Sequence, residues 1–250
     1  MNFDTLNLTI LGPAFLAGIL VLAAHVPMGQ QVLQRGIVFI DLAIAQIAAL
    51  GVIAADALGW EPQGLAVQGA AFCAALLGAF LLTWTEKHWP EVQEAIIGGL
   101  FVLAASAGVL LLANNPHGGE HLKDLLVGQI LWVGMSQLIP ALLLTVLVLV
   151  LWFGFREKLG RTGFYIMFAL AVTTSVQLVG VYLVFSSLIM PALAMRKWPA
   201  EKRLKGGYII GGVAYFSGLA LSAIFDLPSG AVIVWCLAIT GIIFNLKRAA

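Results

Sequence analysis

The sequence predicts an all-α fold, a polytopic membrane bundle of about eight membrane elements, one of them broken or re-entrant. Hydrophobic residues make up 61% of the 250 residues and charged residues only 10%, against roughly 45–50% and about 25% in soluble domains. The apolar residues gather into runs of about 20, the length that crosses a ~30 Å hydrocarbon core. Because barrel-type alternation is absent, the runs are expected to be helices. We expect a single transmembrane domain over residues 1–250, surrounded by membrane lipid.

The helical runs follow one another with short polar connections. They lie at Leu8–Val26, Ile37–Leu58, Leu65–Trp84, Ala95–Ala113, Leu125–Phe155, Gly163–Met195, Gly207–Phe225 and Gly230–Leu246. Two of them are too long for one plain crossing. Leu125–Phe155 could tilt or kink at Pro140, whereas Gly163–Met195 contains Gly180 and ends near Pro191, which predicts a broken element.

The basic residues favour a re-entrant form of Gly163–Met195. If this run enters and returns on one side while the other seven each cross once, 12 of the 13 Lys and Arg residues share one side and only Lys123 lies opposite. The 12 are Arg35, Lys87, Arg156, Lys158, Arg161, Arg196, Lys197, Lys202, Arg203, Lys205, Lys247 and Arg248. Basic residues concentrate on the cytoplasmic side of membrane proteins. We therefore expect the N-terminus outside and the C-terminus in the cytoplasm.

Composition and motifs exclude several classes of function. A soluble enzyme, a coiled coil or a disordered protein could not have so few charges, and a net charge of +1 leaves no basic face for nucleic acid. The sequence has no GxxxxGK[ST], HExxH or GxSxG motif, so we expect neither a P-loop ATPase nor another enzyme. No bound cofactor is expected.

Asp41 is the most informative residue, because it lies inside the second apolar run. A carboxylate near the centre of a bilayer costs about 2.5–3.5 kcal/mol and normally faces a protein interior or a watery path. The alternative is that Asp41 lies near the cytoplasmic interface and pairs with Arg35. Gln46 follows five residues later, about 140° around an ideal helix, so the two would share a path only if the helix were bulged or unwound.

The polar connection 114–124 is a second candidate metal site. His117, Glu120, His121 and Asp124 bring imidazole and carboxylate groups together, a composition that suits borderline divalent metals. A solvated loop with incidental histidines is the alternative, and Gly118–Gly119 argue against an ordered helix there. His25, just before Pro27 at the inner end of the first span, and His88, in an inner loop, are interpreted as interface residues.

Five stretches, in this order along the chain, resemble motifs of the membrane permease subunits of zinc- and manganese-type ABC metal importers. The resemblance covers most of the chain. The stretches are RGIVFIDLAIAQIAALG with Asp41, EAIIGGLFVLAASAGVLLL with Glu94, DLLVGQILWV with Gly128, LVGVYLVFSSLIMPALAM from Leu178, and SAIFDLPSGAVIVW with Asp226, Pro228 and Gly230.

The resemblance implies a permease in a bacterial inner membrane, working with a second copy of itself, a cytoplasmic ATP-binding subunit and a periplasmic or extracellular metal-binding protein. It also implies that Asp41 lines the route of a divalent metal, zinc or manganese. Three departures from the family pattern are visible. The position of the family histidine after Asp41 holds Ala45 or Gln46, depending on the alignment, and Gln129 replaces an aspartate. The connection 156–162 is shorter than the family segment that docks on the ATPase.

Three hypotheses follow from the sequence. The first is the permease subunit of an ATP-driven importer of divalent metal ions, with zinc first and manganese or iron as the other candidates. The second is a metal permease that works without an ATPase, which the short connection 156–162 favours. The third is a non-transporting membrane scaffold of the same fold, which the missing family residues favour and the retention of Asp41 opposes.

Overall fold

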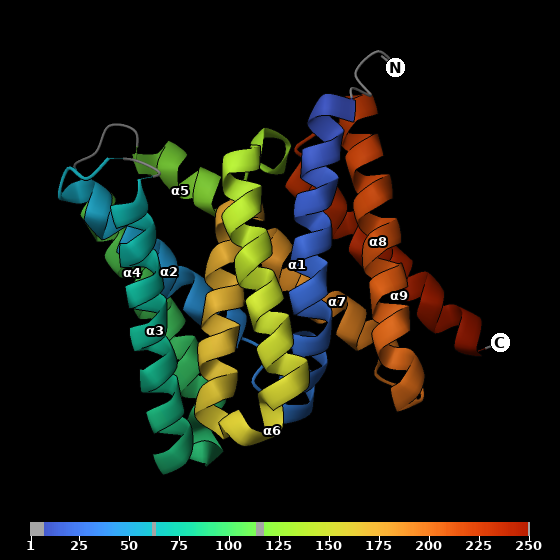
Figure 1. The fold of residues 1–250 in the computed structure, drawn as a ribbon, viewed down its shortest axis with the longest axis horizontal. Helices are drawn as coiled ribbons and strands as arrows, with labels where there is room; N and C mark the ends of the chain where they lie inside the picture. Colours follow the sequence, from blue (N-terminus) through green and yellow to red (C-terminus); the bar gives the residue numbers. More distant parts are fainter. Residues whose placement is uncertain (1–7, 62–63, 114–117, 250) are drawn as a thin grey trace.

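The computed structural model describes residues 8–61, 64–113 and 118–249, and over these residues it contains helices and no strand (Figure 1). Seven of the described helical segments are long and apolar enough to cross a membrane. Two shorter apolar helices, Val181–Met195 and Ser229–Asn245, accompany them. The predicted all-α membrane bundle is therefore confirmed.

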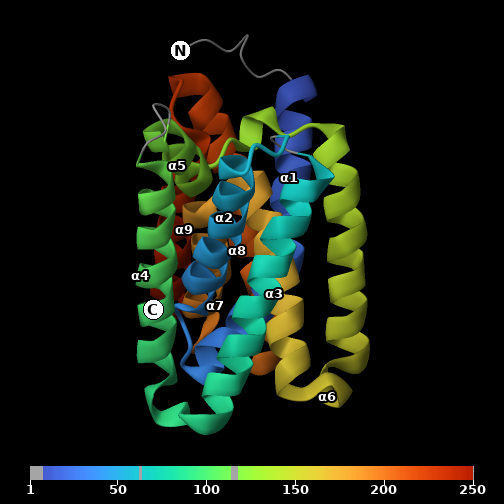
Figure 2. The same cartoon turned by 90° about the vertical axis from the view of Figure 1, so that its left-hand side faces the viewer.

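The first four helices run alternately up and down the bundle (Figures 1 and 2). They are α1 (Leu8–Arg35), α2 (Ile40–Ala57), α3 (Leu65–His88) and α4 (Gln93–Leu112), with a short 3₁₀ turn η2 (Pro90–Val92) before α4. The chain turns from α1 to α2 at Gly36, whose φ of 72° is readily adopted only by glycine. α1 continues through Pro27 and is longer than the predicted run, as membrane helices tolerate proline when neighbouring elements satisfy the freed carbonyl.

The predicted run Leu125–Phe155 is divided in the structure. Helix α5 (Gly118–Val127) lies at the end of the bundle beside the end of α4, and the 3₁₀ turn η3 (Ile130–Trp132) follows it (Figure 2). The long helix α6 (Met135–Val179) begins only after this turn. The break thus lies before Met135 and not at Pro140. The expectation that Gly118–Gly119 would prevent a helix is wrong, because both glycines lie in its first turn.

The predicted broken element is confirmed. α6 bends at Gly160 (φ 59°), so that Met135–Phe155 and Gly160–Val179 form two spans. At Gly180 (φ 80°, ψ 163°) the chain breaks again, and α7 (Val181–Met195) returns toward the end from which Gly160–Val179 started (Figure 1). The next helices are α8 (Ala200–Phe225) and α9 (Ser229–Ala249). α7 packs mainly between α1 and α9.

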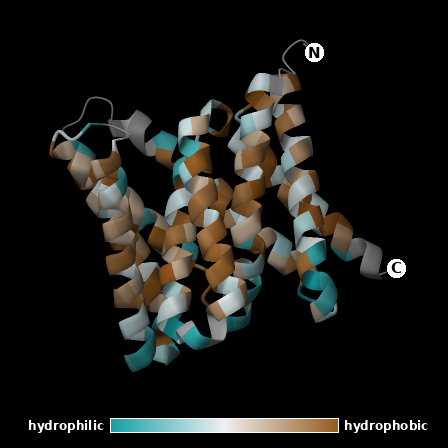
Figure 3. Cartoon of the chain, in the orientation of Figure 1, coloured by the Kyte–Doolittle hydropathy of each residue, from teal (hydrophilic) through white to brown (hydrophobic). Residues whose placement is uncertain are grey.

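The two ends of the bundle differ in polarity (Figure 3). We call the end that carries α5 and Lys123 the α5 end. At the opposite end, the basic end, lie Arg35 at the end of α1, Lys87 at the end of α3, the bend of α6 and the connection from α7 to α8 (Figure 1). This arrangement agrees with the prediction that the run Gly163–Met195, which ends in α7, starts and ends on the same side.

An ion-pair cluster joins three helices at the basic end. Glu86 of α3 lies 3.4 Å from Arg161 and 4.0 Å from Arg35, and its side chain is only 16% exposed. The guanidinium of Arg35 also lies 4.2 Å from the ring centroid of Phe164. The end of α1 is thus held against α3 and the second span of α6.

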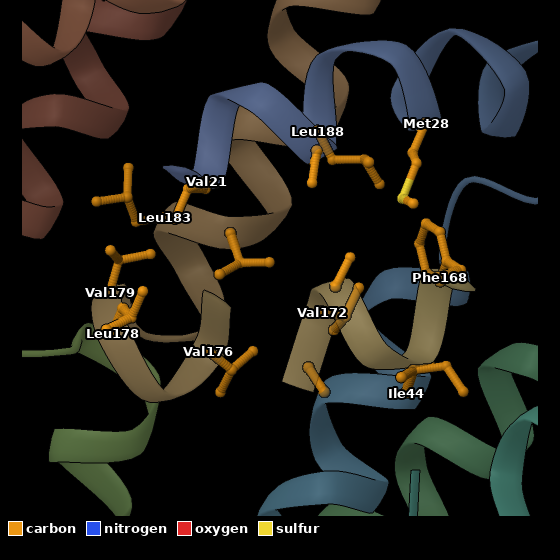
Figure 4. Close-up of a cluster of buried hydrophobic side chains, with 14 of the residues drawn as sticks. Val21, Met28, Ile44, Phe168, Val172, Val176, Leu178, Val179, Leu183 and Leu188 are labelled. Atoms are coloured by element: carbon orange, nitrogen blue, oxygen red, sulfur yellow. The ribbon is translucent and has the colours of Figure 1, made fainter. Parts of the chain in front are cut away.

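The apolar core lies where α1, α2, the second span of α6 and α7 meet. In Figure 4, Met28 of α1 lies beside Leu188 of α7 and Phe168 of α6, and Ile44 of α2 lies on the other side of Phe168. Because lipid is as apolar as these side chains, close packing and not the exclusion of water holds the helices together. Gly29 allows such packing, since a Cβ there would overlap the carbonyl oxygen of Leu188.

Three glycines from separate parts of the chain meet at the α5 end. A Cβ on Gly128, after α5, would overlap the carbonyl of Val179, and a Cβ on Gly180 would overlap the backbone nitrogen of Gly128. A Cβ on Gly230, at the start of α9, would lie 2.6 Å from the carbonyl oxygen of Val127. Backbone therefore packs directly on backbone, and the contact fixes the break between α6 and α7 against α5 and α9.

Candidate functional site

Asp41 lies in the first turn of α2 and is wholly enclosed by its own chain. Its exposure is 0%, and neither carboxylate oxygen has a hydrogen-bond partner among the described residues. Arg35, the partner considered from the sequence, pairs with Glu86 instead. An ionised carboxylate without a partner is expensive to bury. Nothing that the structure describes around Asp41 offsets this cost.

Glu94 orders the turn that leads into Asp41. Its Oε1 accepts a hydrogen bond from the backbone N–H of Phe39 at 3.2 Å, and Phe39 is the residue that precedes the first turn of α2. The neighbouring Gln93 donates from Nε2 to the carbonyl of Leu82 at 3.0 Å and to the hydroxyl of Tyr165 at 3.3 Å. The start of α4 therefore ties α2, α3 and α6 together beside the buried acid.

Gln46 does not join Asp41 on one helix face. It is buried, with 7% exposure, but α2 is a continuous helix from Ile40 to Ala57. The two side chains therefore leave α2 about 140° apart. The bulge that would bring them to one path is absent from this part of the structure, and the proposed role of Gln46 stays a prediction.

The histidine-containing connection is described only in part. His117 lies outside the described residues, and for Glu120 and His121 the description covers the backbone of α5 but not the side chains. Asp124, near the end of α5, is exposed. Among the side chains that the structure describes, no three His, Cys, Asp or Glu residues come together as a metal cluster. The metal role of this connection stays a prediction.

A cavity at the α5 end, with apolar walls and several polar side chains, was not anticipated from the sequence. It has a volume of about 620 Å³ and lies between the ends of α2 and α3, η3 and both spans of α6. Its polar lining includes Asp56, Gln68, Asp124, Gln129, Gln137 and Gln177. No lining residue that the structure describes is Lys, Arg or His, so the cavity carries acidic charge without a compensating cation. Asp56, in the last turn of α2, faces this space.

The position predicted for His25 was also wrong. We expected it at the end of the first span, but α1 continues to Arg35 and His25 has 0% exposure. Its Nδ1 lies 2.9 Å from the carbonyl oxygen of Val21, and its Nε2 has no partner among the described residues. His88 makes the same kind of bond to Trp84 at 2.8 Å but is exposed at the end of α3, as expected.

Comparison with known proteins identifies the family. The model of the ABC 3 transport family matches residues 7–164 and 154–247. The chain belongs to the ABC 3 transport family. Relatives that match most of the chain are named as membrane proteins of metal transport systems, and ABC permeases of this family typically work with an ATPase and a substrate-binding protein. The chain is therefore a multi-pass membrane permease.

Individual relatives cover nearly the whole chain. The high-affinity zinc uptake system membrane protein ZnuB of Haemophilus influenzae is 25% identical over 260 aligned positions, which cover 96% of this chain and 98% of ZnuB. A probable metal transport system membrane protein of Thermotoga maritima is 27% identical over 252 positions, 92% of this chain and 87% of that protein. PsaBC from Streptococcus pneumoniae, solved in complex with Fab, shares the fold with a TM-score of 0.75 at 20% identity, covering 96% of this chain and 95% of that one.

Proposed function

We propose that this chain is the permease subunit of an ATP-driven importer of divalent metal ions, with zinc as the first candidate and manganese or iron as the others. The observation that carries the proposal is the buried, unpaired carboxylate of Asp41. A divalent cation would pair with the Asp41 carboxylate, which has no partner among the described residues. Because the site offers few ligands, the ion could also leave it, as conduction requires. Zinc comes first because the Haemophilus influenzae relative is named for zinc uptake.

The proposal places the protein in a bacterial inner membrane as a dimer of two copies. The basic end faces the cytoplasm, where it meets the ATP-binding subunit, and the α5 end faces outward, where it meets a metal-binding protein. This orientation rests on the gathering of Lys and Arg residues at the basic end. It puts the N-terminus outside and the C-terminus in the cytoplasm.

The connection from α7 to α8 is the proposed contact for the ATP-binding subunit. The shortened connection 156–162 includes the bend at Gly160 and directly joins the two spans of α6, which leaves no separate docking helix there. Between α7 and α8, by contrast, Arg203 donates from Nε to the carbonyl of Trp198 at 2.7 Å and orders a basic turn. A permease that works without an ATPase is the alternative that the short connection favours.

Reconstitution tests the proposal. The chain is co-expressed with its ATP-binding subunit, and the purified complex is placed in liposomes with the metal-binding protein outside. We expect uptake of radioactive zinc or manganese that requires ATP on the cytoplasmic side, and metal-stimulated ATP hydrolysis. Uptake without nucleotide would favour the ATPase-independent permease, and a complex that hydrolyses ATP without response to metal and moves no metal would favour the scaffold.

The acidic cavity at the α5 end leads to a prediction about capture of the metal. Replacing both Asp56 and Asp124 by asparagine is expected to raise the KM for metal uptake on the order of ten-fold and to leave the maximal rate unchanged, because acidic clefts concentrate cations. The effect should shrink as salt screens the charges. Glu201→Gln, an exposed acid at the basic end, is the matched control. An unchanged KM at low salt would exclude this role of the cavity.

A further inference from the structure

The tight turn before Asp41 is bound to α4 by a side chain of that helix. The N–H of Ile40 donates to the carbonyl of Ile37 at 3.2 Å, which closes a turn that contains Phe39. The N–H of Phe39 donates to Oε1 of Glu94 at 3.2 Å. Glu94 lies 55 residues further along the chain, so this hydrogen bond is a contact between distant segments and not part of the turn itself.

Glu94 caps the start of α2 from outside the helix. Phe39 is the N-cap residue of α2, and its side chain makes no capping hydrogen bond. Its ring is 48% exposed, so packing of the ring does not anchor the helix start either. In a capping box, a Glu or Gln three residues after the N-cap accepts a hydrogen bond from the N-cap N–H. In α2 that position holds Leu42, and the acceptor comes from α4 instead.

The acceptor is itself held in place by its neighbour in α4. Gln93 is 3% exposed and donates to the carbonyl of Leu82 at 3.0 Å and to the hydroxyl of Tyr165 at 3.3 Å. Tyr165 follows Arg161 of the ion-pair cluster by about one turn of α6. Glu94 therefore joins the start of α2 to the connection between α3 and α4 at the basic end (Figure 2).

We propose that Glu94 is a positioning residue for Asp41. It holds the carboxylate where the transported cation meets it, and it links that carboxylate to the end of the bundle at which the ATP-binding subunit acts. Asp41 is the second residue of α2, so the backbone that Glu94 fixes also sets the direction of the Asp41 side chain. This inference rests on the proposed import of divalent metals.

The hydrogen bond from Phe39 to Glu94 is expected to matter for metal binding more than for folding. Groups that orient a metal ligand commonly contribute about 10–100-fold to metal affinity. Glu94 acts through the backbone and not on the Asp41 carboxylate directly, which places its contribution at the low end of this range. Ile37 and Ile40 are 4% and 0% exposed, and their packing keeps the turn in the core when the hydrogen bond is removed.

Three substitutions separate the hydrogen bond of Glu94 from its charge. Glu94→Gln keeps an acceptor of the same reach, Glu94→Asp keeps the charge on a shorter side chain, and Glu94→Ala removes both. In liposomes that contain the complex with the ATP-binding subunit, the KM for zinc uptake should rise about ten-fold in the Asp and Ala variants, with an unchanged maximal rate. In Glu94→Gln the KM should stay within about three-fold of the wild type, because a neutral acceptor still bonds the N–H, though more weakly.

Glu91→Ala is the matched control, since Glu91 is an exposed acid three residues earlier, in η2. It should keep the wild-type KM, and all variants should melt close to the wild type in detergent. A Gln variant as impaired as Glu94→Asp would overturn the proposal, because the charge and not the hydrogen bond would then be required. A wild-type KM in Glu94→Asp would overturn it as well, and these two variants decide the outcome even where Glu94→Ala does not fold. A wild-type complex that moves no metal would overturn the proposed function itself.

Discussion

Replacing Asp41 by asparagine or alanine is expected to abolish metal uptake and to leave the folded complex intact. Asparagine has nearly the same shape but no negative charge, so a dication at this position loses its only anionic ligand from α2. An unpartnered buried charge is itself destabilising. We therefore expect Asp41→Asn to melt at the same temperature as the wild type or higher, even though transport is lost. A gain in stability with a loss of activity is typical of a functional group kept at a cost to the fold.

Two measurements check this result on the same preparations. Uptake of radioactive zinc and manganese by reconstituted liposomes reports transport, and thermal unfolding in detergent reports stability. Glu91→Gln, an exposed acid near the start of α4, is the control and should transport normally. Undiminished uptake by Asp41→Asn would refute the role of the carboxylate. A melting temperature that falls together with uptake would indicate instead that Asp41 supports the fold.

Hydropathy and charge were sufficient to predict the bundle and its re-entrant element. Eight apolar runs were long enough to cross, and assigning one crossing to seven of them and a re-entrant path to Gly163–Met195 placed 12 of the 13 basic residues on one side. The break at Gly180 was visible because a glycine interrupts an apolar run that is too long for one span. Asp41 was visible for a related reason, since a charge among apolar residues is rare in membrane helices.

His25 and the cavity could not be found in this way. The sequence suggested that the first span ends near Pro27, which put His25 at the membrane surface. α1 instead continues for two more turns to Arg35, and this places the imidazole in the core. The cavity is assembled from the ends of several elements, so residues such as Asp56 and Gln129 carry no shared signal along the chain.

The contact between Gly128 and Gly180 should be the most sensitive point of the fold. Gly128→Ala or Gly180→Ala is expected to destabilise the protein by about 2–5 kcal/mol. A left-handed backbone costs alanine about 1–2 kcal/mol, and overpacking adds about 1–3 kcal/mol. Both angles are positive, at 70° and 80°, and each new methyl group would meet backbone, which cannot rotate away as a side chain can.

Gly212→Ala is the matched control for this prediction. Gly212 lies in α8 with no atom within 4 Å of an added Cβ, so alanine there should stabilise the helix by up to about 1 kcal/mol. We expect the Gly180 variant to elute as aggregate or to melt well below the wild type, and the Gly212 variant to melt at or above it. Gly180 joins the second span of α6 to α7. Loss of its contact with Gly128 would therefore also detach the re-entrant element from α5. Wild-type melting of both Gly128→Ala and Gly180→Ala would show that backbone contact at the α5 end does not hold this element in place.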